Sequence, residues 1–200
     1  MLRLAVFASG HGSNLEAIHH SITSGLLRGV ELALVVSNNS TSGALYFAKK
    51  KGIAGIHLSL VTCNNDRVKF QDNLLKALED AKIDIIALAG YMKKLPEELL
   101  QRYNGRIVNI HPALLPAFGG FGMYGLNVHR AVIESGSKLS GASVHIVEGE
   151  YDSGEIIVQE SCPVVMGDSP ESLAERIKVI EHRILPRGIQ IIADRLAGNT

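Results

Sequence analysis

The first hundred residues alternate between two patterns of apolar positions. Short apolar runs, typical of buried strands, occur at residues 2–8, 31–37, 55–58 and 83–89. Between them, apolar residues recur at the spacing of an amphipathic helix over residues 15–26, 44–51 and 70–81. This alternation predicts an α/β fold with a mostly parallel, Rossmann-like sheet flanked by helices.

The second half of the chain predicts a different arrangement at the C-terminal edge. We expect a helix from Pro96 through Tyr103, a strand at residues 106–111, a long and mobile covering loop at residues 117–128, and a helix at residues 129–135. Runs at residues 140–147 and 155–160 are joined by a turn-rich segment. They predict an antiparallel hairpin at the edge of the sheet.

The last helix begins at Ser169-Pro170 by the cap and first-turn rules. Its core stripe is Leu173, Ile177, Ile180 and Ile184. Pro186 lacks an amide hydrogen, so we expect it to kink or break the helix. Glu181 and His182 lie mid-helix, where a solvated face is the first interpretation.

Composition limits the class of protein. With 200 residues, 46% of them hydrophobic, the chain is long enough for one well-packed domain and short for two. Twenty basic and twenty acidic residues cancel. Since no overall charge attracts nucleic acid or an anionic membrane, neither is expected as a partner.

The cysteines and the N-terminus predict a cytoplasmic setting. Cys63 and Cys162 are too few and too isolated to indicate a disulfide framework or a metal site. The apolar opening runs directly into a glycine-rich turn and lacks the features of a signal peptide. No segment approaches the length of a membrane span.

The glycine-rich turn at residues 9–14 is a candidate phosphate site. Gly10 and Gly12 let the backbone approach a ligand closely. The amides of a helix start, with the Ser13 hydroxyl and the Asn14 amide, form a natural anion site. The alternative is a tight connection in which Ser13 or Asn14 caps the helix.

A nicotinamide dinucleotide is disfavoured as the ligand of this turn. Its fingerprint needs glycine at position 15 and an acidic residue after the second strand. The chain has Leu15 and then Ser37-Asn38-Asn39.

Asn109 and His111 are the strongest candidates for chemistry. Residues two apart share a face of a strand, and Pro112 should end the strand at His111. An imidazole at that end can move a proton near neutral pH, and an amide can donate to an oxygen that gains charge. The alternative is a strand end whose side chains are satisfied by backbone.

Further candidates have a structural alternative of their own. Arg67 in the first turn of a helix hints at an anionic partner, although a surface arginine is the simpler account. Met92 and Leu95 could line a slot for a flat ring or pack on their own helix. Asp152 could be a turn residue or a carboxylate beside His111. The remaining histidines, His145 among them, have surface or structural placement as the default.

Three motifs together resemble the folate-dependent formyltransferase family. They are Asn109-Ile-His111-Pro-Ala-Leu-Leu-Pro116, Gly10-His-Gly-Ser-Asn14, and Ser143-Val-His145 seven residues before Asp152. The first marks the whole family, and the glycine-rich turn singles out the branch that acts on glycinamide ribonucleotide. Over about residues 2–190, the resemblance implies formyl transfer from 10-formyltetrahydrofolate to the amine of glycinamide ribonucleotide in purine synthesis.

The resemblance also implies a role for each matching residue within a single domain, residues 1–200. In a phosphate-binding half, residues 1–100, the substrate phosphate would lie at Gly12, Ser13 and Asn14. Glu181, from the last helix, would hold its ribose. The folate would be bordered by Arg67, Met92, Lys93, Lys94, Leu95, Asn109, Val147 and Tyr151. In a catalytic and folate-binding half, residues 101–200, Asn109 would lie at the formyl oxygen, His111 would be the acid/base, and Asp152 would keep His111 cationic when needed. No metal is required, and a monomer or homodimer is expected.

Two segments depart from the common family pattern. Residues 117–128 are longer than usual and have no basic residue until Arg130, so phosphate contacts from this loop are not carried over. Relatives usually have Met-Arg-Ile-Leu where this chain has Met92-Lys93-Lys94-Leu95. A backbone contact with a ligand would survive that change.

Other functions compete with this interpretation. A 10-formyltetrahydrofolate hydrolase would use water in place of the amine, but such relatives usually carry an extra N-terminal domain, whereas the first strand here begins at Leu2. Formyl transfer to methionyl-tRNA or to a nucleotide sugar usually goes with additional domains. A catalytically silent phosphate- or folate-binding module is disfavoured, because Asn109, His111 and Asp152 are all present.

Overall fold

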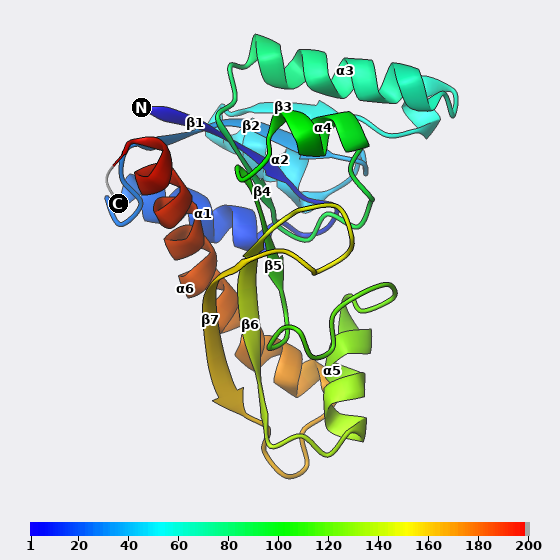
Figure 1. Cartoon of the computed structure of the whole chain (residues 1–200), viewed down its shortest axis with the longest axis vertical. Coiled ribbons are helices and arrows are strands. Elements are labelled where there is room, and N and C mark those ends of the chain that lie inside the picture. Colours follow the sequence, from blue (N-terminus) through cyan, green and yellow to red (C-terminus); the bar gives the residue numbers. More distant parts are fainter. Residues whose placement is uncertain (199–200) are drawn as a thin grey trace.

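The computed structural model describes residues 1–198, in which seven strands form one sheet in the order β3-β2-β1-β4-β5-β6-β7 (Figure 1). The strands are β1 Leu2–Phe7, β2 Val30–Ser37, β3 Ala54–His57, β4 Ile85–Leu88, β5 Ile107–His111, β6 Leu139–Ile146 and β7 Ile156–Pro163. The pairs from β3 to β5 are parallel, and β6 pairs antiparallel with both β5 and β7. The predicted α/β fold with an antiparallel hairpin at its C-terminal edge is confirmed.

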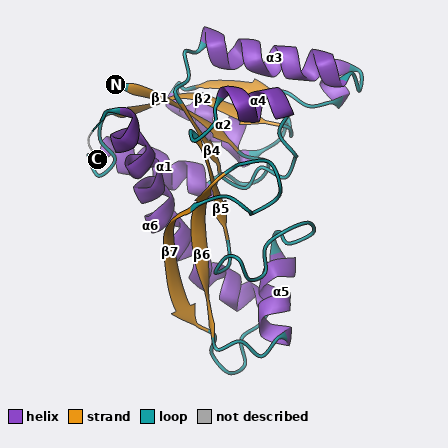
Figure 2. Cartoon of the chain, viewed as in Figure 1, coloured by secondary structure: helices purple, strands orange, loops and turns teal. Residues whose placement is uncertain are grey.

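Helices cover both faces of the sheet (Figure 2). They are α1 Ser13–Thr23, α2 Gly43–Lys51, α3 Arg67–Asp80, α4 Glu97–Arg102, α5 Leu126–Glu134 and α6 Pro170–Leu196, with a short 3-10 helix η1 at Val61–Cys63. In β1, Leu4 and Val6 belong to the core that includes α1 and α6. Ala5 and Phe7 belong to the core that includes α3 and α4. A strand covered on both faces has a continuous apolar sequence, as β1 does.

The register of the strands brings their carboxyl ends to one edge. Phe7 of β1 lies beside Leu88 of β4, and Leu88 lies beside Asn109 of β5. The loops that follow β1 and β4 therefore emerge next to Asn109. In open α/β sheets, ligands bind at this edge.

The predicted helix after the long loop begins earlier than expected. The prediction placed a loop up to residue 128 and a helix from residue 129, whereas α5 begins at Leu126. Val128 is fully buried and lies one turn before the buried Val132. The apolar stripe of the helix therefore starts within the segment that glycines and aromatics had marked as loop.

Of the kink or break predicted at Pro186, the break is wrong. The helix α6 is continuous from Pro170 to Leu196 and contains Pro186 in its interior. A proline inside a helix costs about 3 kcal/mol. Packing beyond it opposes this cost, because Ile189 and Ile192 are 0% and 1% exposed. Gly188 adds close contact, since a Cβ there would lie 2.5 Å from Cγ1 of Val144 on β6.

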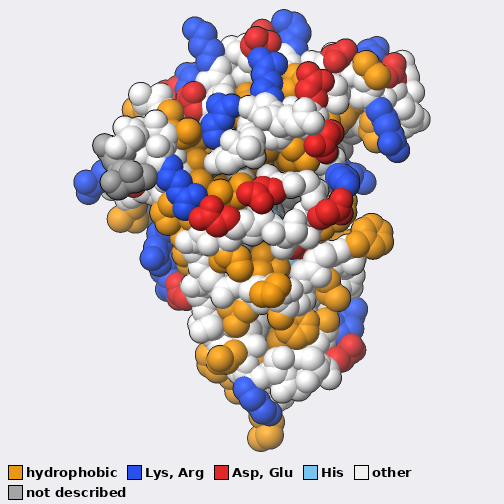
Figure 3. Space-filling view, viewed as in Figure 1, with side chains coloured by type: hydrophobic (Ala, Val, Ile, Leu, Met, Phe, Trp, Pro, Cys, Tyr) orange, Lys and Arg blue, Asp and Glu red, His pale blue; other side chains and the backbone are white. Residues whose placement is uncertain are grey.

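Charged side chains are spread unevenly over the face shown in Figure 3. They gather over the half that carries α3 and α4, whereas the half over β6, β7 and α5 shows mostly hydrophobic and uncharged atoms. Among the helices of residues 1–198, none combines the length and the apolar character needed to cross a membrane.

Candidate active site

Three side chains from two separate segments meet at the end of β5. Asn109 and His111 project to one side of the strand, and both face Asp152 in the connection between β6 and β7. The amide nitrogen of Asn109 lies 3.4 Å from Asp152 Oδ1, and His111 Nδ1 lies 3.4 Å from Asp152 Oδ2. The side chains of His111 and Asp152 are only 4% and 10% exposed. The structure thus brings together the three predicted catalytic residues, whose roles stay a prediction.

Two glycines let the Asp152 segment return over the sheet. A Cβ on Gly154 would lie 1.9 Å from the carbonyl oxygen of Ile146, so the connection passes this point only with glycine. A Cβ on Gly119 would lie 3.2 Å from Cβ of Asp152. Asp152 itself has a left-handed backbone, with φ +55°, as expected of a turn residue. It therefore combines the turn role with a side chain that reaches His111.

His145 is part of this cluster, although sequence reasoning gave it only a structural default. It lies opposite Asn109 in the ladder between β5 and β6. Its Nε2 lies 3.1 Å from the amide nitrogen of Asn109 and 3.5 Å from Asp152 Oδ1. The signal for it was the Ser143-Val-His145 motif. Within the described residues, no group of three or more His, Cys, Asp or Glu side chains is arranged to hold a metal ion.

The loop before α5 contacts both His111 and Asp152. His111 Nε2 lies 2.8 Å from the carbonyl oxygen of Phe118, which can only accept. The amide of Gly120 donates to Asp152 Oδ2 at 2.9 Å. His111 therefore has an acceptor at each ring nitrogen, an arrangement that favours a protonated ring.

Burial acts on His111 in the opposite direction. It lowers the pKa of His111 below its ordinary value, and this effect outweighs the Asp152 carboxylate and the Phe118 carbonyl, which both raise the pKa. Burial raises the pKa of Asp152, but the neighbouring rings of His145 and His111 and the Gly120 amide together lower it. The pair is therefore an ionised carboxylate beside a ring that releases its proton readily. Asp152 acts on His111 in the predicted direction, while burial decides the net shift.

The turn after His111 is fixed by a buried hydroxyl. Ser143 Oγ donates to the Ala113 carbonyl at 2.6 Å and accepts from the Leu115 amide at 3.0 Å. The side-chain amide of Gln159 donates to both Ser143 Oγ and the Leu115 carbonyl. Residues of strands β6 and β7 therefore fix the segment that leads from His111 into the loop before α5.

The glycine-rich turn opens α1 without a side-chain cap. Gly12 is the N-cap residue, with φ +90°, and no side chain accepts a bond there. The alternative in which Ser13 or Asn14 caps the helix is therefore wrong. A cavity of about 460 Å³ opens at these amides and is lined by Ser9, Gly10, His11, Gly12, Ser13, Asn14, Ala89, Gly90, Met92 and Lys178. Free amides at a helix start beside a lysine suit an anion.

Two residues of α6 complete this region. Lys178 lines the cavity, and Glu181, one turn further along, accepts a hydrogen bond from Asn14 Nδ2 at 2.9 Å. Burial raises the pKa of Glu181, against the opposing effects of Asn14 and Lys178. The solvated-face interpretation of Glu181 is thus wrong. Sequence reasoning missed Lys178, whose only signal was its position three residues before Glu181.

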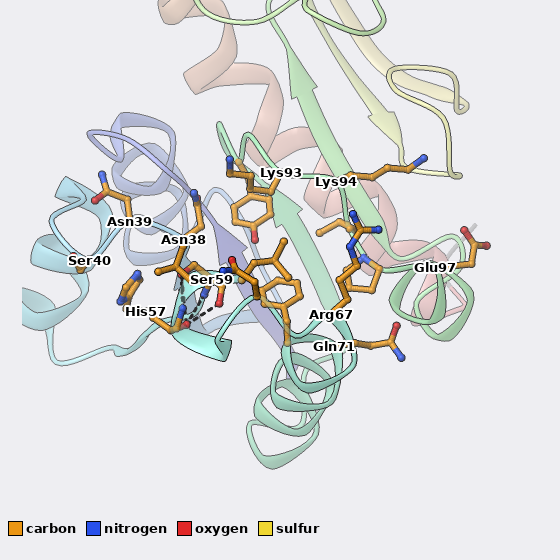
Figure 4. Close-up of a pocket in the computed structure, with 18 residues that line it drawn as sticks. Asn38, Asn39, Ser40, His57, Ser59, Arg67, Gln71, Lys93, Lys94 and Glu97 are labelled. Atoms are coloured by element: carbon orange, nitrogen blue, oxygen red, sulfur yellow. Dashed lines mark hydrogen bonds between the residues drawn. The ribbon is translucent and has the colours of Figure 1, made fainter.

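A larger cavity of about 1030 Å³ lies among the loops after β2, β3 and β4 and the start of α3 (Figure 4). Arg67, Lys93 and Lys94 supply positive charge to its lining. Lys93 lies between the polar group of Asn38, Asn39 and His57 and the side that carries Arg67 and Lys94. Leu95 is buried and adds an apolar wall.

The residues predicted to border a folate fall into separate groups. Arg67, Lys93, Lys94 and Leu95 line the larger cavity. Met92 lines the smaller one, and its backbone amide donates to Ser9 Oγ at 3.1 Å. Val147 and Tyr151 belong to the connection that carries Asp152. Lys94 Nζ lies 3.8 Å from Glu150 Oε1, so this connection meets the loop after β4 at an ion pair.

The similarity to known proteins extends over nearly the whole chain. The family model described as Formyl transferase matches residues 2–189. A relative in Arabidopsis thaliana, "Phosphoribosylglycinamide formyltransferase, chloroplastic", is 41% identical over 182 residues, 91% of this chain and 62% of that protein. The chain therefore spans less than two thirds of the length of the plant relatives that it matches.

Solved structures agree with the fold. Glycinamide ribonucleotide transformylase 1 from Symbiobacterium toebii matches with a TM-score of 0.89 at 36% identity, over 97% of this chain and 88% of that one. A formyltetrahydrofolate deformylase from Pseudomonas syringae pv. tomato matches with a TM-score of 0.84 at 27% identity, over 97% of this chain and 62% of that one.

Proposed function

The chain belongs to the formyl transferase family, and on this premise we propose that it transfers the formyl group of 10-formyltetrahydrofolate to the amine of glycinamide ribonucleotide in purine synthesis. The observation that carries the proposal is the meeting of Asn109, His111 and Asp152 at the sheet edge that also holds an uncapped helix start. One region can move protons, and the other can hold a phosphate.

The smaller cavity fits the phosphate of the nucleotide. The first-turn amides of α1 point at a guest with the positive end of the helix dipole behind them. Lys178 adds a full positive charge to the lining of the same cavity. Glu181 offers carboxylate oxygens that accept hydrogen bonds from ribose hydroxyls, with Asn14 holding it in place.

The larger cavity and the Asp152 connection fit the co-substrate. Leu95 and Phe70 give the cavity apolar surface, and Arg67, Lys93 and Lys94 can pair with the carboxylates of the glutamate part. The ion pair between Lys94 and Glu150 brings this lining close to Tyr151 and Asp152. When bound, 10-formyltetrahydrofolate supplies an activated formyl group.

The cluster supplies what the transfer needs. Amine attack on the formyl carbon places negative charge on the formyl oxygen and requires a proton to move from the incoming to the leaving nitrogen. Asn109 donates a hydrogen bond to that oxygen. His111 takes the proton and returns it, and Asp152 stabilises the ring while it is charged. Binding both substrates at one edge orients the two reacting atoms.

The deciding experiment is incubation with 10-formyltetrahydrofolate, with and without glycinamide ribonucleotide, while the release of tetrahydrofolate is followed. We expect release only with the nucleotide, together with a formylated product. Absence of release in both reactions would contradict the proposal and favour a silent binding module.

A hydrolase is the second candidate, because a formyltetrahydrofolate deformylase shares the fold. Water would then take the place of the amine, with the same three residues. Release of tetrahydrofolate and formate at a rate that ignores the nucleotide would select this function.

We also propose that the activity belongs to a single domain, residues 1–200, with a phosphate-binding half at residues 1–100 and a catalytic half at residues 101–200. A cytoplasmic monomer or homodimer without nucleic-acid or membrane partners remains the expectation. Size-exclusion chromatography with light scattering tests the assembly, and fluorescence microscopy of a tagged protein tests the location.

A further inference from the structure

His145 is held in one orientation by its surroundings. It lies on β6, between β5 and β7, and is 2% exposed. Its Nδ1 lies 2.9 Å from the carbonyl oxygen of Ile146. Because a carbonyl can only accept, Nδ1 carries the hydrogen, and in the neutral ring Nε2 then has a lone pair.

That lone pair faces the side-chain amide of Asn109. The distance from His145 Nε2 to Asn109 Nδ2 is 3.1 Å, so one N–H of the amide donates to the ring. The other N–H faces Asp152 Oδ1 at 3.4 Å, which is long for a hydrogen bond. A better acceptor that enters the site can take this second N–H, whereas the bond to His145 stays in place.

We infer that His145 is a positioning residue, which aims the second N–H of Asn109 at the oxygen on which charge develops. The side-chain amide is planar, so holding one N–H on His145 fixes the direction of the other. This inference rests on the proposed function and names a residue that acts through Asn109, without touching the substrate.

The need for such a residue follows from the symmetry of the amide. The terminal torsion of asparagine is broad and roughly two-fold, so a flip exchanges oxygen and nitrogen at little cost. A flipped Asn109 would present an acceptor to the developing negative charge. Asp152 also disfavours the flip, but through the N–H that the substrate must take. Of the hydrogen bonds that Asn109 Nδ2 makes within residues 1–198, the one to His145 is the one that can hold the amide while the substrate oxygen is bound.

The test compares variants at position 145. His145→Leu removes the acceptor, and we expect kcat to fall by about 10²-fold, the loss typical of one misplaced oxyanion donor. KM for both substrates should stay near the wild-type value. His145→Gln places a carboxamide oxygen near the position of Nε2 and should restore most of kcat. If His145→Leu does not fold, His145→Phe fills the ring volume without an acceptor and takes its place.

A double-mutant cycle separates positioning from general stability. If His145 acts through Asn109, the Asn109→Ala, His145→Leu double variant is no slower than Asn109→Ala alone. Losses of kcat that multiply would overturn the inference, as would full turnover of His145→Leu or a failure of His145→Gln to recover. If Asn109→Ala itself keeps full turnover, the proposed function of Asn109 fails first. If Asn109→Ala is slow and His145→Leu is not, only the inference about His145 fails.

Discussion

The cluster around His111 and the two cavities share one sheet edge but are built differently. Asn109, His111 and His145 lie on neighbouring strands and contact each other or Asp152 at 3.1 to 3.5 Å. Arg67, Lys93 and Lys94 are exposed on loops or at a helix start. Three of the four groups of the cluster thus lie on strands, with Asp152 on the connection after β6, whereas the cations of the larger cavity lie on segments that can move to admit and release a ligand. We expect substitutions in the cluster to affect kcat and those around the cavities to affect KM.

The largest effect is expected at His111. His111→Ala removes the proton carrier, so kcat should fall by about 10³-fold, while nucleotide binding measured by calorimetry changes little. His129→Gln is the matched control, because His129 is similarly buried, at 4% against 3% exposure. It should keep most of the turnover. Unchanged turnover of His111→Ala would remove His111 from the mechanism.

Asp152→Asn should have the next largest effect. The carboxylate raises the pKa of His111 against the stronger effect of burial. Replacing it by a neutral amide therefore lowers that pKa further, so the ring in the variant becomes protonated only at a more acidic pH. We expect the NMR titration of His111 to lie below pH 6.5 in the wild type and lower still in the variant, with kcat reduced by about 10²-fold. A titration that moves to higher pH would contradict the assigned role of Asp152.

A change at the glycine-rich turn should move KM and leave kcat largely intact. Ser13→Asp places a negative charge where the phosphate is proposed to bind, so KM for the nucleotide should rise about tenfold or more. KM for the folate should change little. Ser169→Asp is the control, since it makes the same replacement at the start of α6. Equal effects of Ser13→Asp on both KM values would argue against the phosphate assignment.

The smallest effect is expected at the ion pair between the two regions. Lys94→Ala removes the partner of Glu150, and both side chains are more than half exposed. Pairs of this kind contribute little, so KM for the folate should rise only about two- to threefold, and less at high salt. Lys76→Ala on α3 is the control for loss of an exposed lysine. A large loss of kcat in Lys94→Ala would erase the division between the regions.

The sequence predicted the strand-borne region better than the loop-borne one. The alternation at residues 106–111 and the following Pro112 were enough to place Asn109 and His111 together at a strand end. The partner His145 was missed because the antiparallel register of β5 and β6 is set by the topology of the whole sheet and by no local pattern.

The residues that line the cavities were harder to predict from the sequence, for a physical reason. Lys178 reaches the glycine-rich turn only through the packing of α6 on α1, which no spacing near the turn encodes. The larger cavity is a volume left between four segments, to which Asn38 and His57 contribute without any motif. Local rules also failed where packing opposed them, as at Pro186, whose helix continues because the residues beyond it are buried.

The backbone at Asp152 sets a limit on what can replace this residue. A left-handed φ is tolerated by glycine, asparagine and aspartate far better than by longer side chains. Of the two acidic amino acids, only aspartate therefore fits the main chain at this point. A glutamate at this position would require a different turn conformation. The length of the acidic side chain and the shape of the hairpin therefore depend on each other.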